Sequence, residues 1–443
     1  MMREIDHMLA ERIERHEREV LPAYAKLWAY YRNPMREVPR TSGPHGRWYR
    51  LAQESGLPAR LFGRTGDELR TPRREIVVEN DIAWRLHTMV DFLFGKGFTI
   101  RALGMTPARS ELIERALQEV FDRSGGGAMW QDGALLAHIF GHVDFTVTED
   151  ASHGARIEMI DPRRAVALVN AEDCRVIDAY AVHLVSGVTC ATGAKWGRLT
   201  RVVTPDGAAM YEDGVRTNLK ETPWTGGKLP VVHVQNIAQP LSYEGLGEVE
   251  SLIPLQDELN TRLSDRASRV TLQSFKMYLA KGIGGSGMPP VAPGQLWLTD
   301  NPDAAIDEFG GDASSPSEDR HIDEIRDALD KVSGVPPLAS GVVQAKIGNL
   351  SSANALKVTL MSLLSKTSRK QAAYGRAIGE LCTLTLDLLH HQGVLSTQPQ
   401  ERRVRVTWPD PLPPDVRERI FAAEAKARLG APRERVLAEL GDI

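Results

Sequence analysis

The sequence predicts an α+β protein in which a β-rich body precedes a series of long helices. Residues 351–392 carry apolar side chains at the three- and four-residue spacing of one helical face. Residues 143–234 instead alternate with a period near two, as half-buried strands do. The two patterns occupy separate parts of the chain, and together they define the predicted fold class.

The longest helix is expected over residues 351–392. Ser351 or Ser352 can cap its first turn, and Gly393 stands where a glycine commonly ends a helix. Roughly 42 residues at 1.5 Å each would span about 63 Å, more than a small domain. The apolar stripe thins over 365–371, so we expect a kink or a change of packed layer there. An ordinary long core helix with one solvated patch is the alternative to a helix that needs neighbouring subunits.

The amino-acid composition limits the classes of protein to which the chain can belong. The chain has 443 residues, 42% hydrophobic and 25% charged, which is ordinary for a soluble globular protein of two to four structural units. A formal net charge of −4 excludes a generally basic nucleic-acid coat, although not local basic rings. Cys174, Cys190 and Cys382 are far apart, which fits a reducing compartment and neither a disulfide framework nor a zinc ribbon. No signal-peptide core or membrane-spanning apolar run is expected.

The N-terminal part is predicted to begin with helix. Ile5, Leu9, Ile13, His16 and Val20 form a narrow stripe, which predicts an amphipathic surface helix. Residues 36–74 then form a Gly- and Pro-punctuated loop with nine arginines against four acids. This loop is either a solvated connection or a docking arm for an acidic partner.

Further helices and strands follow in order. Helices are expected over 82–93, from Thr106-Pro107 to the glycines at 125–127, and over 129–141. The predicted strands of the β-rich body are 143–147, 156–160, 176–185, 197–203 and 229–234, separated by Gly, Asp-Pro and Asp-Gly punctuation.

After Pro240 the chain is predicted to return to helix over 246–272, with its regular part beginning at Pro254. Arg262, Arg266 and Arg269 form a polar stripe on this helix, which usually means exposure to water. A compact unit follows at 275–309, with strands at 275–280 and 295–298 around a loop at 282–294. Ser315-Pro316 then starts a second helix that runs to Val332, so that two helices bracket the compact unit.

The sequence contains no complete catalytic motif. Residues 282–287 satisfy G-x-G-x-x-G, but Met288-Pro289-Pro290 follows where a phosphate-binding helix should start. His138 and His142 lack the glutamate of H-E-x-x-H and are expected to be packed or surface histidines. No P-loop motif is present either. We therefore expect no enzyme, no cofactor and no metal site.

The order of these parts resembles the portal proteins of tailed double-stranded DNA phages, particularly the siphophage type. The resemblance covers most of the chain, and the order of its moderately specific strings is the stronger signal. The strings are Glu79–Ile82, Val90–Gly97, Ile160–Pro162, Leu229–Asn236, Gly247–Asn260, Ser352–Lys357 and Trp408–Pro413.

The resemblance implies a ring, commonly of twelve subunits, at one capsid vertex of the virion, assembled in the host cytoplasm. Double-stranded DNA would pass through it without sequence specificity. The terminase large subunit, the head-to-tail adaptor and the major capsid protein would dock on it, with no membrane involved. The implied parts are an N-terminal wing (1–245), stem helices (246–274 and 313–333), a clip (275–312), a channel loop (334–350), the long helix with a returning strand (351–412) and a crown (413–443). The crown is short for the family, which leaves its size and role open.

Three sets of site residues follow from this assignment. The acidic residues Asp319, Asp323 and Asp330 would line the channel on the stem, where they would repel phosphate and let DNA slide. The expected clip contacts between subunits come from aromatic residues, and the loop residues expected to touch DNA are polar: Phe275, Tyr278 and Trp297 in the clip, and Gln344, Lys346 and Asn349 in the loop.

Each assignment has an alternative that the sequence leaves open. The acidic face could turn to outside solvent, the clip aromatics could pack within one subunit, and the loop could be a plain connection between two helices. For the whole chain, the alternatives are a different head-to-tail junction protein such as an adaptor, a capsid or scaffold protein, and a nucleotide-dependent enzyme.

Overall fold

The structure is a computed structural model that describes residues 2–33, 77–103, 106–170, 172–173, 176–190, 193–205, 207–221, 227–273, 277–281, 303, 305–309, 315–340, 353–412, 416–430 and 432. The chain forms two compact units. Unit 1 comprises Met1–Arg32, Ile82–Leu252 and Asp330–Ile443, and unit 2 comprises Asn33–Asp81 and Ile253–Leu329. The arginine-rich segment predicted at 36–74 lies wholly outside the described residues.

The helices of unit 1 begin and end close to their predicted signals. They are α1 (Met2–Arg15), the π-helical turn η1 (His16–Val20), α2 (Leu21–Arg32), α4 (Asp81–Phe94), α5 (Pro107–Arg123), α6 (Gly126–Phe140), α9 (Ala353–Thr359), α10 (Met361–His391) and α11 (Val416–Arg428). Short 3₁₀ turns occupy Pro162–Arg164, Glu250–Leu252, Pro337–Ser340 and Pro399–Arg402. Within the described ranges, no helix combines the length and apolarity that a membrane crossing requires.

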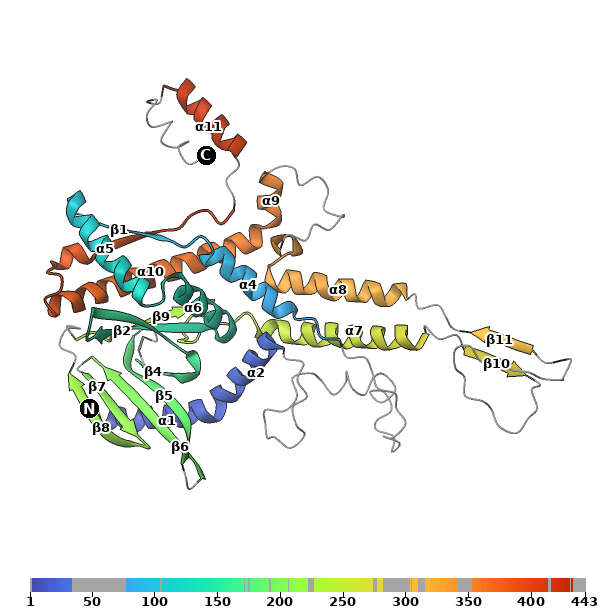
Figure 1. The fold of residues 1–443 in the computed structure, drawn as a ribbon, viewed down its shortest axis with the longest axis horizontal. Coiled ribbons are helices and arrows are strands. Elements are labelled where there is room, and N and C mark those ends of the chain that lie inside the picture. The colour runs from blue at the N-terminus through green and yellow to red at the C-terminus, as the bar shows by residue number, and fades with distance from the viewer. Residues whose placement is uncertain are drawn as a thin grey trace. The chain divides into compact units, whose positions relative to one another are not determined.

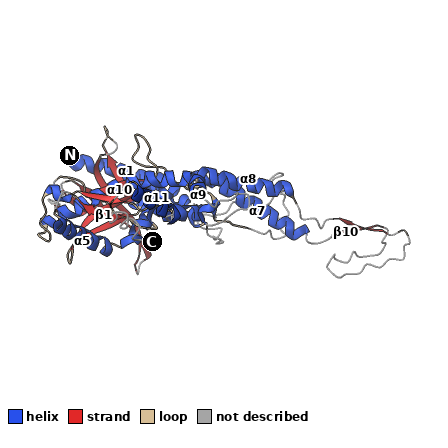
Figure 2. Ribbon diagram, turned by 90° about the horizontal axis from the view of Figure 1, so that it is seen from above, coloured by secondary structure: helices blue, strands red, loops and turns tan. Residues whose placement is uncertain are grey.

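Three sheets belong to unit 1, and Figure 2 shows its strands among the helices. A two-stranded sheet pairs β1 with β12, a three-stranded sheet has the order β3-β2-β9, and a five-stranded sheet has the order β4-β5-β6-β7-β8. The strands are β1 (Thr99–Ala102), β2 (His142–Asp150), β3 (Gly154–Ile160), β4 (Ala165–Val169), β5 (Ile177–Cys190), β6 (Gly193–Thr204), β7 (Gly207–Glu212), β8 (Val215–Glu221), β9 (Val231–Gln235) and β12 (Val404–Thr407).

The five strands predicted for the β-rich body are confirmed as β2, β3, β5, β6 and β9. Strands β4, β7 and β8 were not predicted. β7 and β8 form a hairpin across Asp213-Gly214, whose φ angles of 48° and 82° are positive at both positions. Positive φ at two successive residues characterises the type I′ hairpin turn, and Asp-Gly is a preferred sequence for it. The Asp-Gly signal was therefore present, but neither strand beside it alternates clearly, because β7 is mostly apolar (GAAMYE) and β8 mostly polar (VRTNLKE).

The main core of unit 1 lies between α10 and the three-stranded sheet, with α5 and α6 beside it (Figure 1). Trp130 of α6, Phe145 of β2 and Tyr374 and Leu388 of α10 are all buried within it. A smaller cluster places Leu9 of α1 against the five-stranded sheet. The amphipathic stripe of the N-terminal segment is thus the side that packs, with Leu9 2% and His16 5% exposed.

The predicted long helix is interrupted earlier than expected. Its regular structure breaks at Leu360, between α9 and α10, and not near the middle of 365–371. The expected change of packed layer is confirmed, because Leu360 and Leu363 belong to one buried cluster and Tyr374 belongs to the main core. The stretch between them is mixed: Ser365, Ser368 and Arg369 are exposed, whereas Thr367 and Lys370 are 3% and 4% exposed.

Unit 2 contains the two bracketing helices and a small sheet. They are α7 (Ile253–Gln273), α8 (Pro316–Ser333, whose last turn belongs to unit 1), and the antiparallel strands β10 (Met277–Lys281) and β11 (Ala305–Phe309). The start of α7 beside Pro254 and the start of α8 at Pro316 are confirmed. The strand expected at 295–298 lies outside the described residues.

Candidate functional site

The arginine stripe of α7 is used for ion pairs within the chain. Arg266 Nη1 lies 2.9 Å from Asp319 Oδ1 of α8, and the Arg269 guanidinium pairs with the Glu318 carboxylate. Arg262 remains on its own helix, 2.7 Å from Glu258 Oε1. The expectation that this stripe faces only water is therefore corrected, because two of its three arginines join α7 to α8.

The acidic residues predicted for the channel differ in their surroundings. Asp323 is exposed, and Asp319 is 57% exposed although it pairs with Arg266. Asp330 is only 21% exposed, and its Oδ1 lies 2.7 Å from Nη2 of the buried Arg85. Asp330 is therefore not a free carboxylate on an open face. The channel role of all three residues remains a prediction, and Asp330 fits it least.

The ion pair of Arg269 with Glu318 should contribute measurably to stability, because the side chains are only 26% and 18% exposed. A double-mutant cycle with Arg269→Ala and Glu318→Ala is expected to give a coupling free energy of about 1 kcal/mol in urea unfolding. The control is Arg320 and Glu324, an exposed pair within α8 whose side chains are 83% and 62% exposed. It should show no measurable coupling, and equal coupling in both cycles would contradict a specific link between α7 and α8.

The clip and loop residues are mostly beyond what the structure describes. Phe275, Trp297, Gln344, Lys346 and Asn349 lie outside the described residues. Tyr278 lies in β10, where its backbone pairs with Glu308 of β11. The clip and loop roles therefore stay predictions.

A polar ladder on α7 holds an extended segment of unit 2. Gln256, Asn260 and Ser264 recur every four residues and are nearly fully buried. The amide groups of Asp81, Glu79 and Val77 donate to them, at 3.1, 2.9 and 3.1 Å respectively. Backbone groups without such partners would be costly to bury, so the ladder fixes residues 77–81 along α7.

Four ionisable side chains of unit 1, most of them buried, form what we call the lysine cluster: His138, Glu248, Lys366 and Lys370. Lys370 Nζ lies 2.9 Å from Glu248 Oε1 and donates to His138 Nε2 at 2.8 Å. Lys366 Nζ donates to Glu248 Oε2 at 2.9 Å and to the carbonyl oxygen of Ser333 at 2.7 Å. Lys366 therefore links the segment before α7 to the last residue of α8, and both of these places belong to unit 1.

Protonation in the lysine cluster follows from burial and from its charges. Burial lowers the pKa of Lys370 to about 8, although the Glu248 charge opposes this. Burial would raise the pKa of Glu248, but the two lysines outweigh it and lower the pKa to about 2. Burial and then the Lys370 charge lower the pKa of His138 to about 3. His138 is therefore neutral at pH 7, donating from Nδ1 to Ala134 O and accepting from Lys370.

Glycines bring Glu248 to this position. The Glu248 amide donates to the carbonyl oxygen of His138 at 2.7 Å, which docks residues 245–248 on the end of α6. A Cβ on Gly247 would lie 2.6 Å from the carbonyl oxygen of Ile139, closer than a side chain can approach. The Gly247-Glu248 pair therefore has a physical role, in which the glycine permits the contact and the acid meets the lysines.

A second buried cation holds the start of the predicted channel loop. Arg85 is 2% exposed, and its Nη1 donates to Ser333 Oγ at 3.0 Å and to Val335 O at 2.7 Å. Together with the ion pair to Asp330, these bonds fix the last turn of α8 and the first residues after it. The first residues of the predicted channel loop are therefore held in place by Arg85.

A further buried carboxylate, Asp144 of β2, accepts hydrogen bonds from three side chains. Tyr180 Oη donates at 2.6 Å, Tyr243 Oη at 3.1 Å and His233 Nδ1 at 2.7 Å. Burial would raise the pKa of Asp144, but the histidine and tyrosine partners outweigh it and lower the pKa. The Asp144 side chain is fully buried, and its bond from Tyr180 joins the three-stranded sheet to β5.

The lysine cluster and the polar ladder were not recognised from the sequence. Lys366 and Lys370 are spaced by four on a helix, and Gln256, Asn260 and Ser264 repeat the same spacing on the apolar side of theirs. A polar row on a buried face was the available signal. What it could not reveal was the partner, since Glu248 is 122 residues from Lys370.

A family comparison matches residues 86–443 to "Phage portal protein, SPP1 Gp6-like". The match includes the lysine cluster and the channel-loop segment. The chain belongs to the phage portal protein family. The resemblance inferred from the order of its parts is therefore confirmed, and portal proteins are structural proteins of the head-to-tail junction of the virion.

The solved structures include two similar chains from gene transfer agent particles. One, from "Neck of empty GTA particle computed with C6 symmetry", has a TM-score of 0.47 and 14% identity over 80% of this chain and 90% of that one. The other, from "Virion of native gene transfer agent (GTA) particle", has a TM-score of 0.43 and 13% identity over 81% and 89%. No curated protein matches the chain.

Proposed function

We propose that this portal protein assembles into a closed ring of about twelve copies at one capsid vertex. Double-stranded DNA enters and leaves through the hole of that ring. The observation that carries the proposal is the portal family match across residues 86–443. The order of α7, the β10–β11 unit, α8 and the loop after Ser333 supports it, because a helix pair and a following loop are the parts a subunit contributes to a channel wall.

The loop at 334–350 is proposed as the part that touches DNA. Gln344 and Asn349 can hydrogen-bond to phosphate oxygens without reading sequence, and Lys346 adds one positive charge per subunit. A single weak contact per subunit is screened by salt and is broken readily as DNA moves. The anchoring of Ser333 by Lys366 and of Val335 by Arg85 supports this proposal, since a loop that contacts a moving polymer needs a fixed root.

The stem is proposed to present Asp323 and Asp319 toward the DNA. Their carboxylates would keep the phosphate backbone from adhering to the channel wall. Pairing with Arg266 reduces the charge at Asp319, so Asp323 carries most of this effect.

The clip is proposed to receive the terminase large subunit during packaging and the head-to-tail adaptor afterwards. Among the described residues the β10–β11 sheet has two strands, and an isolated two-stranded hairpin is marginally stable at best. Contacts from Phe275, Tyr278 and Trp297 to an adjacent subunit would supply the missing stability. The major capsid protein is the proposed partner of the wing.

The test combines assembly with packaging. Negative-stain images of the purified chain should show closed rings with a central hole, and a monodisperse monomer would contradict the proposal. Lys346→Glu should leave the rings intact while lowering packaged DNA on the order of tenfold, because a ring of acids would then face the phosphates. Lys346→Arg keeps the charge and should package normally. Normal packaging by Lys346→Glu would show that the loop is only a connector.

A further inference from the structure

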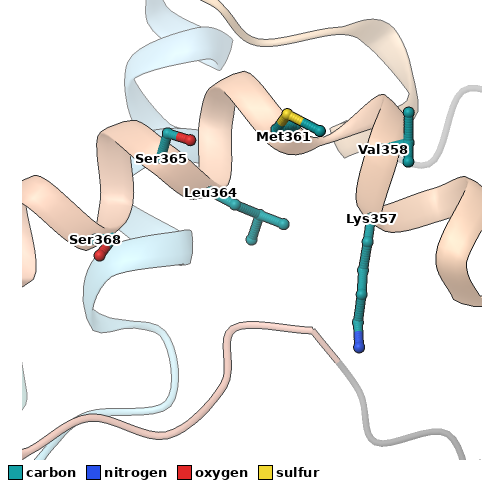
Figure 3. A pocket seen from close by; sticks show the side chains of 6 residues that line it. All are labelled: Lys357, Val358, Met361, Leu364, Ser365 and Ser368. Atoms are coloured by element: carbon teal, nitrogen blue, oxygen red, sulfur yellow. The ribbon is translucent and has the colours of Figure 1, made fainter.

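The break between α9 and α10 leaves an open apolar surface. Six residues of these two helices line a shallow groove of about 510 Å³, which Figure 3 shows; we call it the junction groove: Lys357, Val358, Met361, Leu364, Ser365 and Ser368. Val358 is 65% and Met361 57% exposed. Leu360 and Leu363 beside them are buried in a core cluster, and Leu364 of the groove packs against that cluster, so the groove borders a packed core while Val358 and Met361 stay uncovered.

The spacing of the groove residues suits a docked helix. Val358, Met361, Ser365 and Ser368 follow one another at intervals of three, four and three, so they share one side of the α9–α10 segment. The two apolar side chains come first, and the two serines follow. Small residues let a second helix approach closely, while the apolar pair offers surface to cover.

A second exposed apolar surface lies on α11. Phe421, Ala425 and Leu429 are spaced by four and share one side, which we call the α11 stripe. Phe421 is 69% and Leu429 88% exposed, whereas Ala423 on the opposite side is 5% exposed. The helix therefore has one packed side and one uncovered apolar side. Glu424 lies beside the stripe and is exposed.

We propose that the α11 stripe of one subunit docks in the junction groove of the neighbouring subunit. Phe421 covers Val358 and Met361, the helix lies over the serines, and Glu424 approaches Lys357. The charges complement each other, with one acid beside the stripe and one lysine in the groove.

A second copy is the occupant because the two surfaces differ. A groove and a stripe that are complementary, but not self-complementary, make a head-to-tail contact, which is the kind of contact that a cyclic ring repeats between its neighbouring subunits. The position of α11 along the chain agrees. Leu412 is buried with Leu360 and Leu363, beside the junction of α9 and α10. Four residues of extended chain reach at most about 14 Å, so in every subunit α11 begins at Val416 within about that distance of Leu412. This proposal rests on the proposed ring.

The test is a crosslink between subunits in assembled rings. In a background with Cys174→Ser and Cys190→Ser, retaining the buried Cys382, the pair Met361→Cys and Phe421→Cys is treated with a short bismaleimide. Denaturing gels should show a ladder of dimers, trimers and larger species. Either cysteine alone should give none. Val394→Cys with Phe421→Cys is the matched control, because Val394 is 60% exposed but lies outside the groove.

The outcomes separate this proposal from the ring itself. Rings that give no ladder overturn the docking and leave the ring standing, whereas a monomer in negative stain overturns the ring. A crosslink within one chain, seen as a fast-migrating monomer, assigns the groove to the subunit's own helix and also overturns the proposal. A charge exchange adds a second measurement: Lys357→Glu and Glu424→Lys should each lower the urea midpoint of ring dissociation, and together should restore it. Losses that simply add would contradict the pairing.

Discussion

Replacing Lys370 with methionine is expected to destabilise the chain by about 3 kcal/mol, at the lower end of the ~3–5 kcal/mol seen when one partner of a buried ion pair is removed. Glu248 is 3% exposed and would keep only Lys366 as a charged partner. His138 Nε2 would also lose its donor. The free energy of unfolding in urea measures the loss.

Two variants make this result specific. Arg369→Met changes the preceding residue, which is exposed, and should have little effect. Lys370→Met combined with Glu248→Gln removes both charges of the closest pair, so it should recover part of the loss. A Lys370→Met protein as stable as the unsubstituted chain would mean that the lysine cluster does not hold the segment before α7 and the end of α8.

The folded chain is expected to lose stability steeply below about pH 6.5, because two buried histidines resist protonation. Burial lowers the pKa of His142 to about 4, against the opposing charge of Asp144, and that of His138 to about 3. Above pH 6.5 both are neutral whether the chain is folded or unfolded. As the pH falls, both histidines become protonated in the unfolded chain at a higher pH than in the folded chain. The unfolded chain therefore binds more protons, and the equilibrium shifts toward unfolding.

The size of this effect follows from the difference between the pKa of each histidine in the unfolded chain and its lower pKa in the folded chain. Between pH 6.5 and 4, each histidine costs roughly 3 kcal/mol, since one pKa unit corresponds to about 1.4 kcal/mol. Urea midpoints measured across that range should fall continuously. Below about pH 4.5 the protonation of Glu248, whose pKa is lowered to about 2, adds to the loss in the same direction.

His142→Phe provides the discriminating variant. The ring of His142 packs beside Tyr243 and His233, and its Nδ1 has no hydrogen-bond partner in the described structure. Phenylalanine keeps the ring and removes the proton site, so about half of the slope between pH 6.5 and 4 should disappear. His153→Gln, at a 52% exposed histidine, should leave the slope unchanged. An unchanged slope in His142→Phe would assign the acid sensitivity to other groups.

The order and type of the elements could be predicted from the sequence. Thr106-Pro107 and Ser315-Pro316 start helices where they were expected, because proline has a fixed φ angle that suits the first helical position. Five strands were found from their alternation, which is likewise a local property of the sequence. The family could also be inferred, because it depends on the order of such local parts.

The partners of the polar residues were decided only by the tertiary structure. The segment around Lys370 has the composition of a solvated patch, yet the lysine is buried against Glu248 and His138. Arg266 and Arg269 have the pattern of a solvent-facing stripe, yet they pair with α8, and Asp330 pairs with Arg85. Periodicity reports which side chains share a face of one element. Whether a charge on that face meets water or an opposite charge depends on residues that are distant in the sequence, and only folding brings them together.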